Sequence, residues 1–474
     1  MTTSLTLPTE TRLAIGQDLF SIESYLNEQF NRSLHEDVSN HTRPWLEFKI
    51  RTKKHQHRQQ HRQHQLLPST YMIYTDLQRL RGLWTPADYG SGIEYMDGVL
   101  ALHSGVIQSL GQSLPSSSSS TPNIQMGLWL AGAKGCRDIV QGRLDDQLDA
   151  LWDYLLTRHK QGRLGMTYVR VGYEFDNPDF GYSQHPALFI EAYRYVVDNC
   201  RKVFVKASYH RHTHHRRVGC RDVVQFVWHS WAAGLPMKET NDTSVSQYSL
   251  VDFYPGNEVV DWIGMSVFSQ LYNPTIAANE FLTNVSLLGN RQTIQDVLDF
   301  ADQVAPDIPI MIAESTPYGG LDTIVDPWKY WFVPILELIA QQESTRNPIR
   351  MWSYINCDWN SQPMWQHAGF GDTRLSSNST VMKLWRQHVL RFDSVNHPIS
   401  HKPNQHGTWG LVSLVQTDRD PLRSDWSLLY GMMVIILVLW VGRRKSRLIC
   451  IARHNTIRER VDDEVSRTSF YGSL

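Results

Sequence analysis

Eight short apolar runs alternate with helix-like segments between about residue 12 and residue 392. The runs are rich in β-branched and aromatic residues and are bounded by glycine, proline or polar residues, which is the pattern of buried strands. This alternation predicts an α/β protein built as a (β/α)8 TIM barrel. The predicted strands are Arg12–Asp18, Thr70–Asp76, Ile124–Ala131, Met166–Asn177, Val223–Trp231, Asp261–Phe268, Ile308–Thr316 and Ile349–Cys357.

Helical spacing of apolar residues marks several of the segments between these runs. In the clearest case, Arg143 to His159, five leucines fall on one face and the acidic and basic residues fall opposite. Further helices are predicted at Ile22–Phe30, at about 92–110, at Pro186–Lys202, at about 293–304, and after Asp326, where Pro327 suits the first helical position.

Two of the predicted strands deliver a glutamate at the same end. The fourth leads into Glu174, which stands between Tyr173 and Phe175, and the seventh ends on Glu314. Taken alone, either residue is more simply explained as a solvated charge at a strand end. Because barrel enzymes carry their catalytic groups at the C-terminal ends of the strands, the pair instead favours a hydrolase that works with two carboxyl groups.

Composition excludes some classes of function. The formal net charge of −1 argues against a nucleic-acid surface built on phosphate contacts. Five cysteines occur without a CxxC spacing, so a zinc or redox motif is not supported, and both disulfides and buried free thiols stay open. The histidine-rich stretches Lys53–Gln65 and His210–His215 indicate solvated insertions rather than a metal site. We therefore expect no metal and no cofactor.

The C-terminal part has a different character. Residues 1–395 are predicted to form the barrel, with His/Arg-rich insertions near 31–68 and 206–220, and 396–425 form a linker. Trp426 to Gly442 holds seventeen uncharged residues followed by RRKSR, which predicts a single transmembrane helix with the basic tail 443–474 in the cytosol. A hydrophobic C-terminal helix of the soluble domain is the alternative.

This topology places the barrel in a lumenal or extracellular compartment, although the first residues show no signal peptide. A helix acting as a tail signal would instead leave the barrel in the cytosol. We favour a truncated or unrecognised N-terminus. Sequons at Asn31, Asn40, Asn241, Asn284 and Asn378 are compatible with a lumenal glycoprotein, although such triplets also arise by chance.

Five strings in order along the chain carry a family resemblance: VRVGYEFDN, QFVWHSWA, FYPGNEVVDWIGMSVF, PIMIAEST and MWSYINCDW. Together they resemble glycoside hydrolase family 26, which contains β-mannanases and enzymes acting on xylan and mixed-linkage β-glucan. The resemblance runs from Arg12 to about Arg391. It implies hydrolysis with retention of configuration, with Glu174 as general acid/base and Glu314 as nucleophile.

Further site residues follow from the resemblance and from strand spacing. Trp352 on the eighth strand resembles the platform on which the sugar ring stacks. Trp228 and His229 on the fifth strand and Phe268 on the sixth are candidate wall residues. Core packing is the alternative for each of them and for Trp352. Arg170 lies four residues before Glu174, on the same strand face, and is a further candidate for substrate binding. Its alternatives are to hold a carboxylate or to pair inside the barrel. Gln17 and Asp18 end the first strand and have a weaker claim to binding.

Tyr173 is a further candidate for substrate binding, and it departs from the family pattern, since Asn or His usually precedes the acid/base glutamate there. Asp176 is a candidate substitute acid. The sequence therefore predicts a membrane-anchored, monomeric hydrolase of β-linked polysaccharide such as mannan, xylan or β-glucan, without a nucleic-acid partner. The alternatives are a non-catalytic, membrane-anchored glycan-binding barrel, which Tyr173 would favour, and a purely structural membrane protein.

Overall fold

The computed structural model describes residues 6–38, 68–109, 121–209, 218–232, 248–268 and 294–390. These residues belong to one compact unit, Met1–Asp393. The linker, the predicted transmembrane helix and the tail lie outside the described residues, as do most of the residues of both His/Arg-rich insertions. Within the described ranges, no helix is long and apolar enough to cross a membrane.

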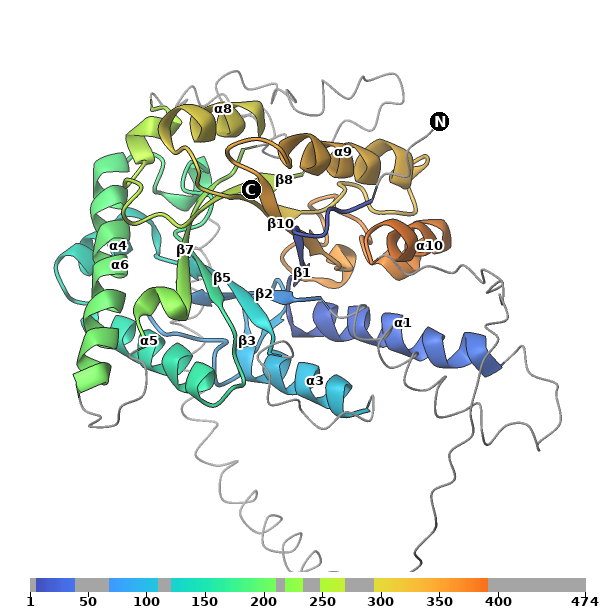
Figure 1. Cartoon of the computed structure of the whole chain (residues 1–474), viewed down its shortest axis with the longest axis horizontal. Coiled ribbons are helices and arrows are strands. Elements are labelled where there is room, and N and C mark those ends of the chain that lie inside the picture. Colours follow the sequence, from blue (N-terminus) through green and yellow to red (C-terminus); the bar gives the residue numbers. More distant parts are fainter. Residues whose placement is uncertain are drawn as a thin grey trace, which may run out of the picture. The chain divides into compact units, whose positions relative to one another are not determined.

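Eight parallel strands close into a barrel in the order β1-β10-β9-β8-β7-β6-β5-β2 (Figure 1). Every predicted strand is present, which confirms the (β/α)8 architecture. The strands are β1 Arg12–Gly16, β2 Thr70–Asp76, β5 Asn123–Trp129, β6 Thr167–Val171, β7 Val224–Ser230, β8 Trp262–Val267, β9 Ile310–Ser315 and β10 Ile349–Ile355. A two-stranded antiparallel hairpin, β3 Ala87–Asp88 and β4 Ile93–Glu94, follows β2 and was not predicted.

Helices lie outside the strands (Figure 1). They are α1 Leu19–Val38, α3 Met96–Ser109, α4 Gly132–Val140, α5 Asp145–Lys160, α6 Pro186–Tyr209, α8 Ile294–Val304, α9 Val333–Gln342 and α10 Ser379–His388. Short helical turns complete the fold: η2 Pro178–Phe180, η3 Cys220–Asp222, η4 Leu250–Phe253, η5 Trp328–Phe332, η6 Trp359–Ser361 and η7 Leu375–Ser377. Two of these helices were not predicted from the sequence: α4, a nine-residue helix with glycines at 132 and 135, and α10.

The predicted apolar face of α5 is the buried one. Leu148, Leu151 and Leu155 are completely buried, and Trp152 and Leu156 join them. Burial of each such side chain stabilises the fold by about 1.5–3 kcal/mol. The charged residues of α5 face outward, as the helical spacing predicts. Arg158 is a partial exception, because it reaches Asp97 of α3 in an ion pair of 2.7 Å.

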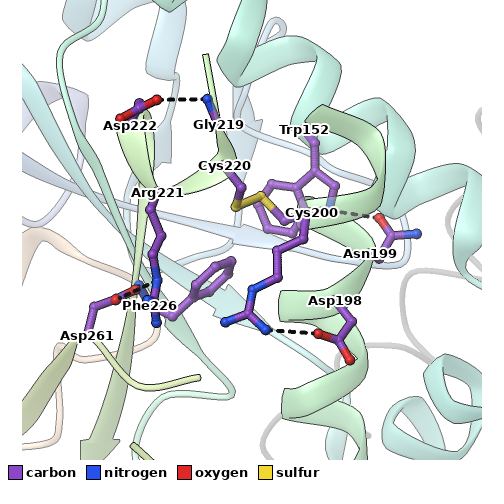
Figure 2. The surroundings of a disulfide bond; sticks show 11 residues. Trp152, Asp198, Asn199, Cys200, Gly219, Cys220, Arg221, Asp222, Phe226 and Asp261 are labelled. Carbon is purple, nitrogen blue, oxygen red and sulfur yellow. Dashed lines mark hydrogen bonds and ion pairs between the residues drawn. A yellow bond between two sulfur atoms is a disulfide. The ribbon is translucent and has the colours of Figure 1, made fainter. Parts of the chain in front are cut away.

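The four cysteines in the described part of the chain divide into one bonded pair and two buried thiols, and Cys450 lies outside it. Cys200 of α6 and Cys220 of η3 form a disulfide with an S–S distance of 2.04 Å (Figure 2). Cys136 and Cys357 are buried free thiols. The disulfide ties the C-terminal half of α6 to η3, just before β7. Both possibilities that the sequence left open therefore occur in the same chain.

Candidate active site

The backbone after β6 turns sharply to present Glu174. The fourth strand ends at Val171 rather than continuing to Asn177, because Gly172 and Glu174 have positive φ angles of 55° and 52°. For a residue with a side chain, this left-handed conformation costs of the order of 1–3 kcal/mol. The turn is held by the Asn177 N–H, which donates to the Glu174 carbonyl at 2.8 Å. Local strain at a buried carboxyl group is typical of a functional position.

Glu174 is nearly buried, with 6% of its surface exposed. Its Oε1 accepts a hydrogen bond from Ser266 Oγ at 2.6 Å, and its Oε2 accepts one from Asn177 Nδ2 at 3.3 Å. Burial and the negative charge of Glu314 raise the pKa of Glu174 to about 8, while Ser266 and Asn177 act in the opposite direction. The raised pKa favours the protonated form of Glu174, which is the form that a general acid needs.

A β-bulge directs Glu314 into the barrel. On β9, Met311 and Ala313 face the barrel interior, so strict alternation would turn Glu314 outward. The register with β8 shifts at this point: Met265 pairs with Ile312, but Ser266 pairs with Glu314. The extra residue brings Glu314 to the inner face, where 7% of its surface stays exposed. Bulges near active sites commonly redirect a side chain in this way.

Arg170 compensates the charge of Glu314. It projects inward from β6, is completely buried, and donates from Nη1 to Glu314 Oε1. Its guanidinium carbon lies 4.9 Å from the ring centre of Tyr74 and 5.4 Å from that of Tyr173. Burial opposes the charge of Arg170, but Glu314 and Tyr74 raise its pKa above the ordinary arginine value. The two carboxyl groups therefore have different environments: one is paired with a cation and the other is buried in its acid form.

His229 lies between these two environments. Its Nε2 is 3.0 Å from Ser266 Oγ, and its Nδ1 is 3.4 Å from Arg170 Nη1. Burial and the charge of Arg170 hold the pKa of His229 well below its usual range, so the ring is neutral. Of the predicted wall residues, His229 thus reaches the site.

The two predicted tryptophans lie on the outer face of the barrel. Trp228 stacks on Phe175 with ring centres 4.6 Å apart and donates to the Phe253 carbonyl at 3.0 Å. Trp352 is completely buried, donates to Ser315 Oγ at 2.9 Å, and packs 5.3 Å from Trp385 of α10. Neither ring has a face open to a sugar, so the structure does not bring Trp228 or Trp352 to the site.

Tyr173 and Phe268 lie at the catalytic end of the barrel. Tyr173 is in ring contact with Tyr74 at 5.4 Å and with Trp129 at 6.1 Å. Phe268 follows β8 directly and joins an apolar cluster with Met72, Ile355, Cys357, Trp359 and Phe370. Tyr173 therefore borders the carboxyl pair, while Phe268 packs against the cluster beside it.

The other candidate residues, Asp176, Asp18 and Gln17, make hydrogen bonds within the barrel framework. Asp176 accepts from Ser230 Oγ and from the Trp231 N–H, both at 2.6 Å, so both of its oxygens are engaged at the end of β7. Asp18 caps the start of α1 by accepting from the Phe20 N–H at 2.8 Å. The Gln17 amide donates to the Ser91 carbonyl. These hydrogen bonds explain the positions of the three side chains, and no catalytic role is needed to account for them.

Tyr74, Ser266 and Asn177 belong to the site and were not predicted. Tyr74 points inward from β2, and burial together with the charge of Glu314 raises its pKa well above the usual range. β1 and β2 pair only at Ala14↔Thr70 and Ile15↔Tyr71. Beyond that point, Oε2 of the buried Glu94 carboxyl group accepts a hydrogen bond from the Tyr74 N–H at 3.0 Å. A polar serine on the inner face of the apolar strand β8 was the signal available for Ser266.

No cluster of three or more metal-ligating side chains occurs in the described part of the chain. The groups gathered at the site are two carboxyl groups, one guanidinium, one neutral imidazole and several hydroxyls. This arrangement can supply a proton from Glu174 and a carboxylate nucleophile from Glu314.

Comparison with known proteins gives distant relatives. No family model matches the chain. It is 24% identical over 340 residues to a β-1,3-xylanase of an Alcaligenes species and 22% identical over 342 residues to one of a Vibrio species. The alignments cover 70% and 68% of this chain but only 60% and 59% of those relatives.

Similar solved structures include a family 26 endo-β-1,4-mannanase from a Bacillus species, with a TM-score of 0.41, 16% identity, and coverage of 67% of this chain and 76% of that one. A modular endo-β-1,4-mannanase from Cellulomonas fimi has a TM-score of 0.40 and 15% identity, with coverage of 68% and 63%. The chain spans about three fifths of the length of the curated relatives that it matches.

Proposed function

We propose that this protein is a glycoside hydrolase of the family 26 type that cleaves a β-linked polysaccharide with retention of configuration. The observation that carries the proposal is the contrast between two carboxyl groups at the catalytic end of one barrel. Glu174 is buried with a raised pKa, and Glu314 is paired with Arg170. Environments that separate two carboxyl groups in this way support Glu174 as the acid and Glu314 as the nucleophile.

In the first step, Glu174 gives its proton to the glycosidic oxygen while a Glu314 oxygen attacks the anomeric carbon. The bond between that carbon and the leaving oxygen breaks, a neutral sugar alcohol departs, and a glycosyl ester of Glu314 forms. In the second step, Glu174 takes a proton from water, the water oxygen attacks the anomeric carbon, and the Glu314 carboxylate leaves.

The electrostatics of the site favour this change of role. The negative charge of Glu314 is one of the causes of the raised pKa of Glu174. Once Glu314 is esterified, that charge is gone, so the pKa of Glu174 falls and its carboxylate becomes available as a base. Arg170 meanwhile stabilises the charge that returns to Glu314 when the ester is hydrolysed.

The relatives suggest which polysaccharide to test first. Both curated relatives are named as β-1,3-xylanases, so β-1,3-xylan is our first candidate substrate. The disulfide between Cys200 and Cys220 supports the further proposal that the barrel works in an oxidising, lumenal or extracellular compartment, anchored through the segment from Trp426 to Gly442.

The test is hydrolysis by the full chain of a panel of β-1,3-xylan, β-1,4-xylan, mannan, mixed-linkage β-glucan and β-1,3-glucan. Glu174→Gln and Glu314→Gln run beside the wild type. We expect one polymer to be cleaved, both variants to lose at least about a hundredfold in rate, and proton NMR to show the β-anomer as the first product. Binding without product in the folded wild type would favour the glycan-binding alternative instead.

Azide separates the two roles in alanine variants, assayed with an activated aryl glycoside. With Glu174→Ala, azide should intercept the glycosyl ester and give a β-glycosyl azide. With Glu314→Ala, azide should attack the substrate directly from the opposite face and give an α-glycosyl azide. The reverse assignment of products would show that the two residues had been exchanged.

A further inference from the structure

A continuous chain of contacts connects the two carboxyl groups. Arg170 Nη1 donates to Glu314 and lies 3.4 Å from His229 Nδ1. His229 Nε2 lies 3.0 Å from Ser266 Oγ, which in turn lies 2.6 Å from Glu174 Oε1. Arg170, His229 and Ser266 are completely buried, so bulk water does not compete for these hydrogen bonds.

The donors in this chain have one consistent direction. A guanidinium can only donate, so His229 Nδ1 must be the acceptor nitrogen of its ring. A neutral imidazole carries one N–H, which is then on Nε2 and points at Ser266 Oγ. The serine hydroxyl has one hydrogen, and with its oxygen accepting from His229 that hydrogen goes to Glu174 Oε1.

We propose that this chain fixes the catalytic proton of Glu174 on Oε2, with Ser266 as the positioning residue. The carbonyl oxygen of a carboxylic acid is a better acceptor than its hydroxyl oxygen, so the short bond from Ser266 favours Oε1 as the carbonyl oxygen and Oε2 as the oxygen that carries the acid proton. Asn177 Nδ2 donates to a lone pair of the same oxygen at 3.3 Å and leaves its O–H free to point at the leaving group. The proton is thereby held on the oxygen that does not face Ser266. The catalytic meaning of the proposal rests on the proposed function, whereas the direction of the hydrogen bonds does not.

Several other charges act on Glu174 and have to be held constant in a test. Glu314 of β9 and Asp176 of the same loop both raise its pKa. Arg170 of β6 faces Glu314, and Tyr74 of β2 interacts with both Arg170 and Glu314. His229 of β7 reaches Glu174 through Ser266. A substitution at Ser266 leaves all of these groups in place.

The bond from Ser266 stabilises the carboxylate more than the acid, because hydrogen bonds to an ionised acceptor are the stronger ones. Ser266→Ala should therefore raise the pKa of Glu174 by about one to two pH units. Without the bond, the proton can also sit on Oε1. Cleavage of polysaccharide, which needs that proton, should then fall by about tenfold or more in kcat/KM. An aryl glycoside whose leaving group needs no proton should lose much less.

The first readout needs no activity. For each Ser266 variant in the full chain, the free energy of unfolding is compared with that of its Glu174→Gln double variant across pH 5 to 10. The pH at which the difference becomes constant reports the pKa of Glu174. Ser353→Ala is the matched control, because Ser353 is also a buried serine, bonded to Gln125 rather than to Glu174.

We expect Ser266→Ala to move this pH upward, Ser353→Ala to leave it unchanged, and Ser266→Thr, which keeps the hydroxyl, to restore it. No movement in Ser266→Ala, or equal movement in Ser353→Ala, would overturn the proposal. If Ser266→Thr does not fold, His229→Gln and His229→Leu replace it. Gln keeps a donor toward Ser266 and should preserve the pKa, whereas Leu should raise it; equal behaviour of the two would also overturn the proposal.

The second readout is the basic limb of kcat/KM on the cleaved polysaccharide, which should move with the pKa from unfolding. If the wild type cleaves no glycan, the proposed function fails, but the unfolding comparison still decides the direction of the hydrogen bonds. If glycan is cleaved but the basic limb of kcat/KM does not shift in Ser266→Ala, the positioning role of Ser266 is refuted while the proposed function is retained.

Discussion

Glu174→Gln should change how the stability of the folded chain depends on pH. The pKa of Glu174 rises from 4.5 to about 8 on folding, through burial and the charge of Glu314. Below the lower value, both the folded and the unfolded chain hold the proton. Between the two values only the folded chain holds it, so raising the pH favours the unfolded state. Above the upper value, neither state holds it.

The magnitude follows from one proton. Across the window between the two pKa values, the wild type should lose about 1.4 kcal/mol of stability per pH unit relative to Glu174→Gln. Gln has the shape of the protonated acid and can still accept from Ser266, so the difference isolates the titration of this carboxyl group. Every other titrating group contributes nearly equally to both proteins and cancels.

Urea unfolding of both proteins at half-unit steps from pH 4 to pH 9 measures this difference. A constant difference over the whole range would refute the reasoning, because it would mean that folding does not change the pKa of Glu174. Glu314→Gln provides the control background. With the neighbouring charge removed, the pKa of Glu174 should fall, so the sloping part should end at a lower pH.

Three further predictions concern the rest of the site and its support. Replacing Cys200 and Cys220 together by serine should lower the free energy of unfolding by about 3 kcal/mol, because the separation of 20 residues is no longer closed in the unfolded chain; equal urea midpoints would contradict this. Tyr74→Phe should lower kcat by about tenfold with little change in KM, because its hydroxyl interacts with Glu314; an effect on KM alone would show a role only in binding. Asp176→Asn should lower stability by about 1–3 kcal/mol through weaker bonds to Ser230 and Trp231, whereas a shifted basic limb of the pH–rate profile would return Asp176 to the role of acid.

The barrel was predictable from sequence because each strand is a local apolar run with its own boundaries. The residues at which the strands end were harder to predict. The fourth strand stops at Val171 through two positive φ angles, one of them at Glu174, which the composition of the run does not reveal. The helix α4 begins at a glycine just after the left-handed Ala131 and was hidden by its shortness.

The side-chain roles divide according to strand alternation. Trp228 and His229 are neighbours in one strand and cannot both face the barrel interior, so period-two spacing alone could have removed one of them. The same spacing puts Trp352 outside, because Met351 faces inward. For Glu314 the rule would have given the wrong face. The β-bulge opposite Ser266 reverses it, and a bulge depends on how two strands pair rather than on either sequence.

Arg170 connects the roles of the two carboxyl groups. It bonds directly to Glu314, but it reaches Glu174 only through His229 and Ser266. Arg170 is separated from Glu174 by two side chains and does not offset the effect of burial on the pKa of Glu174. Burial raises that pKa, and the charge of Glu314 raises it further. The same buried guanidinium therefore pairs directly with one carboxyl group and, in our proposal, sets the position of the proton on the other by orienting His229. In the proposed mechanism, the asymmetry between the two carboxyl groups originates in Arg170, the inward-facing residue of β6 four positions before Glu174.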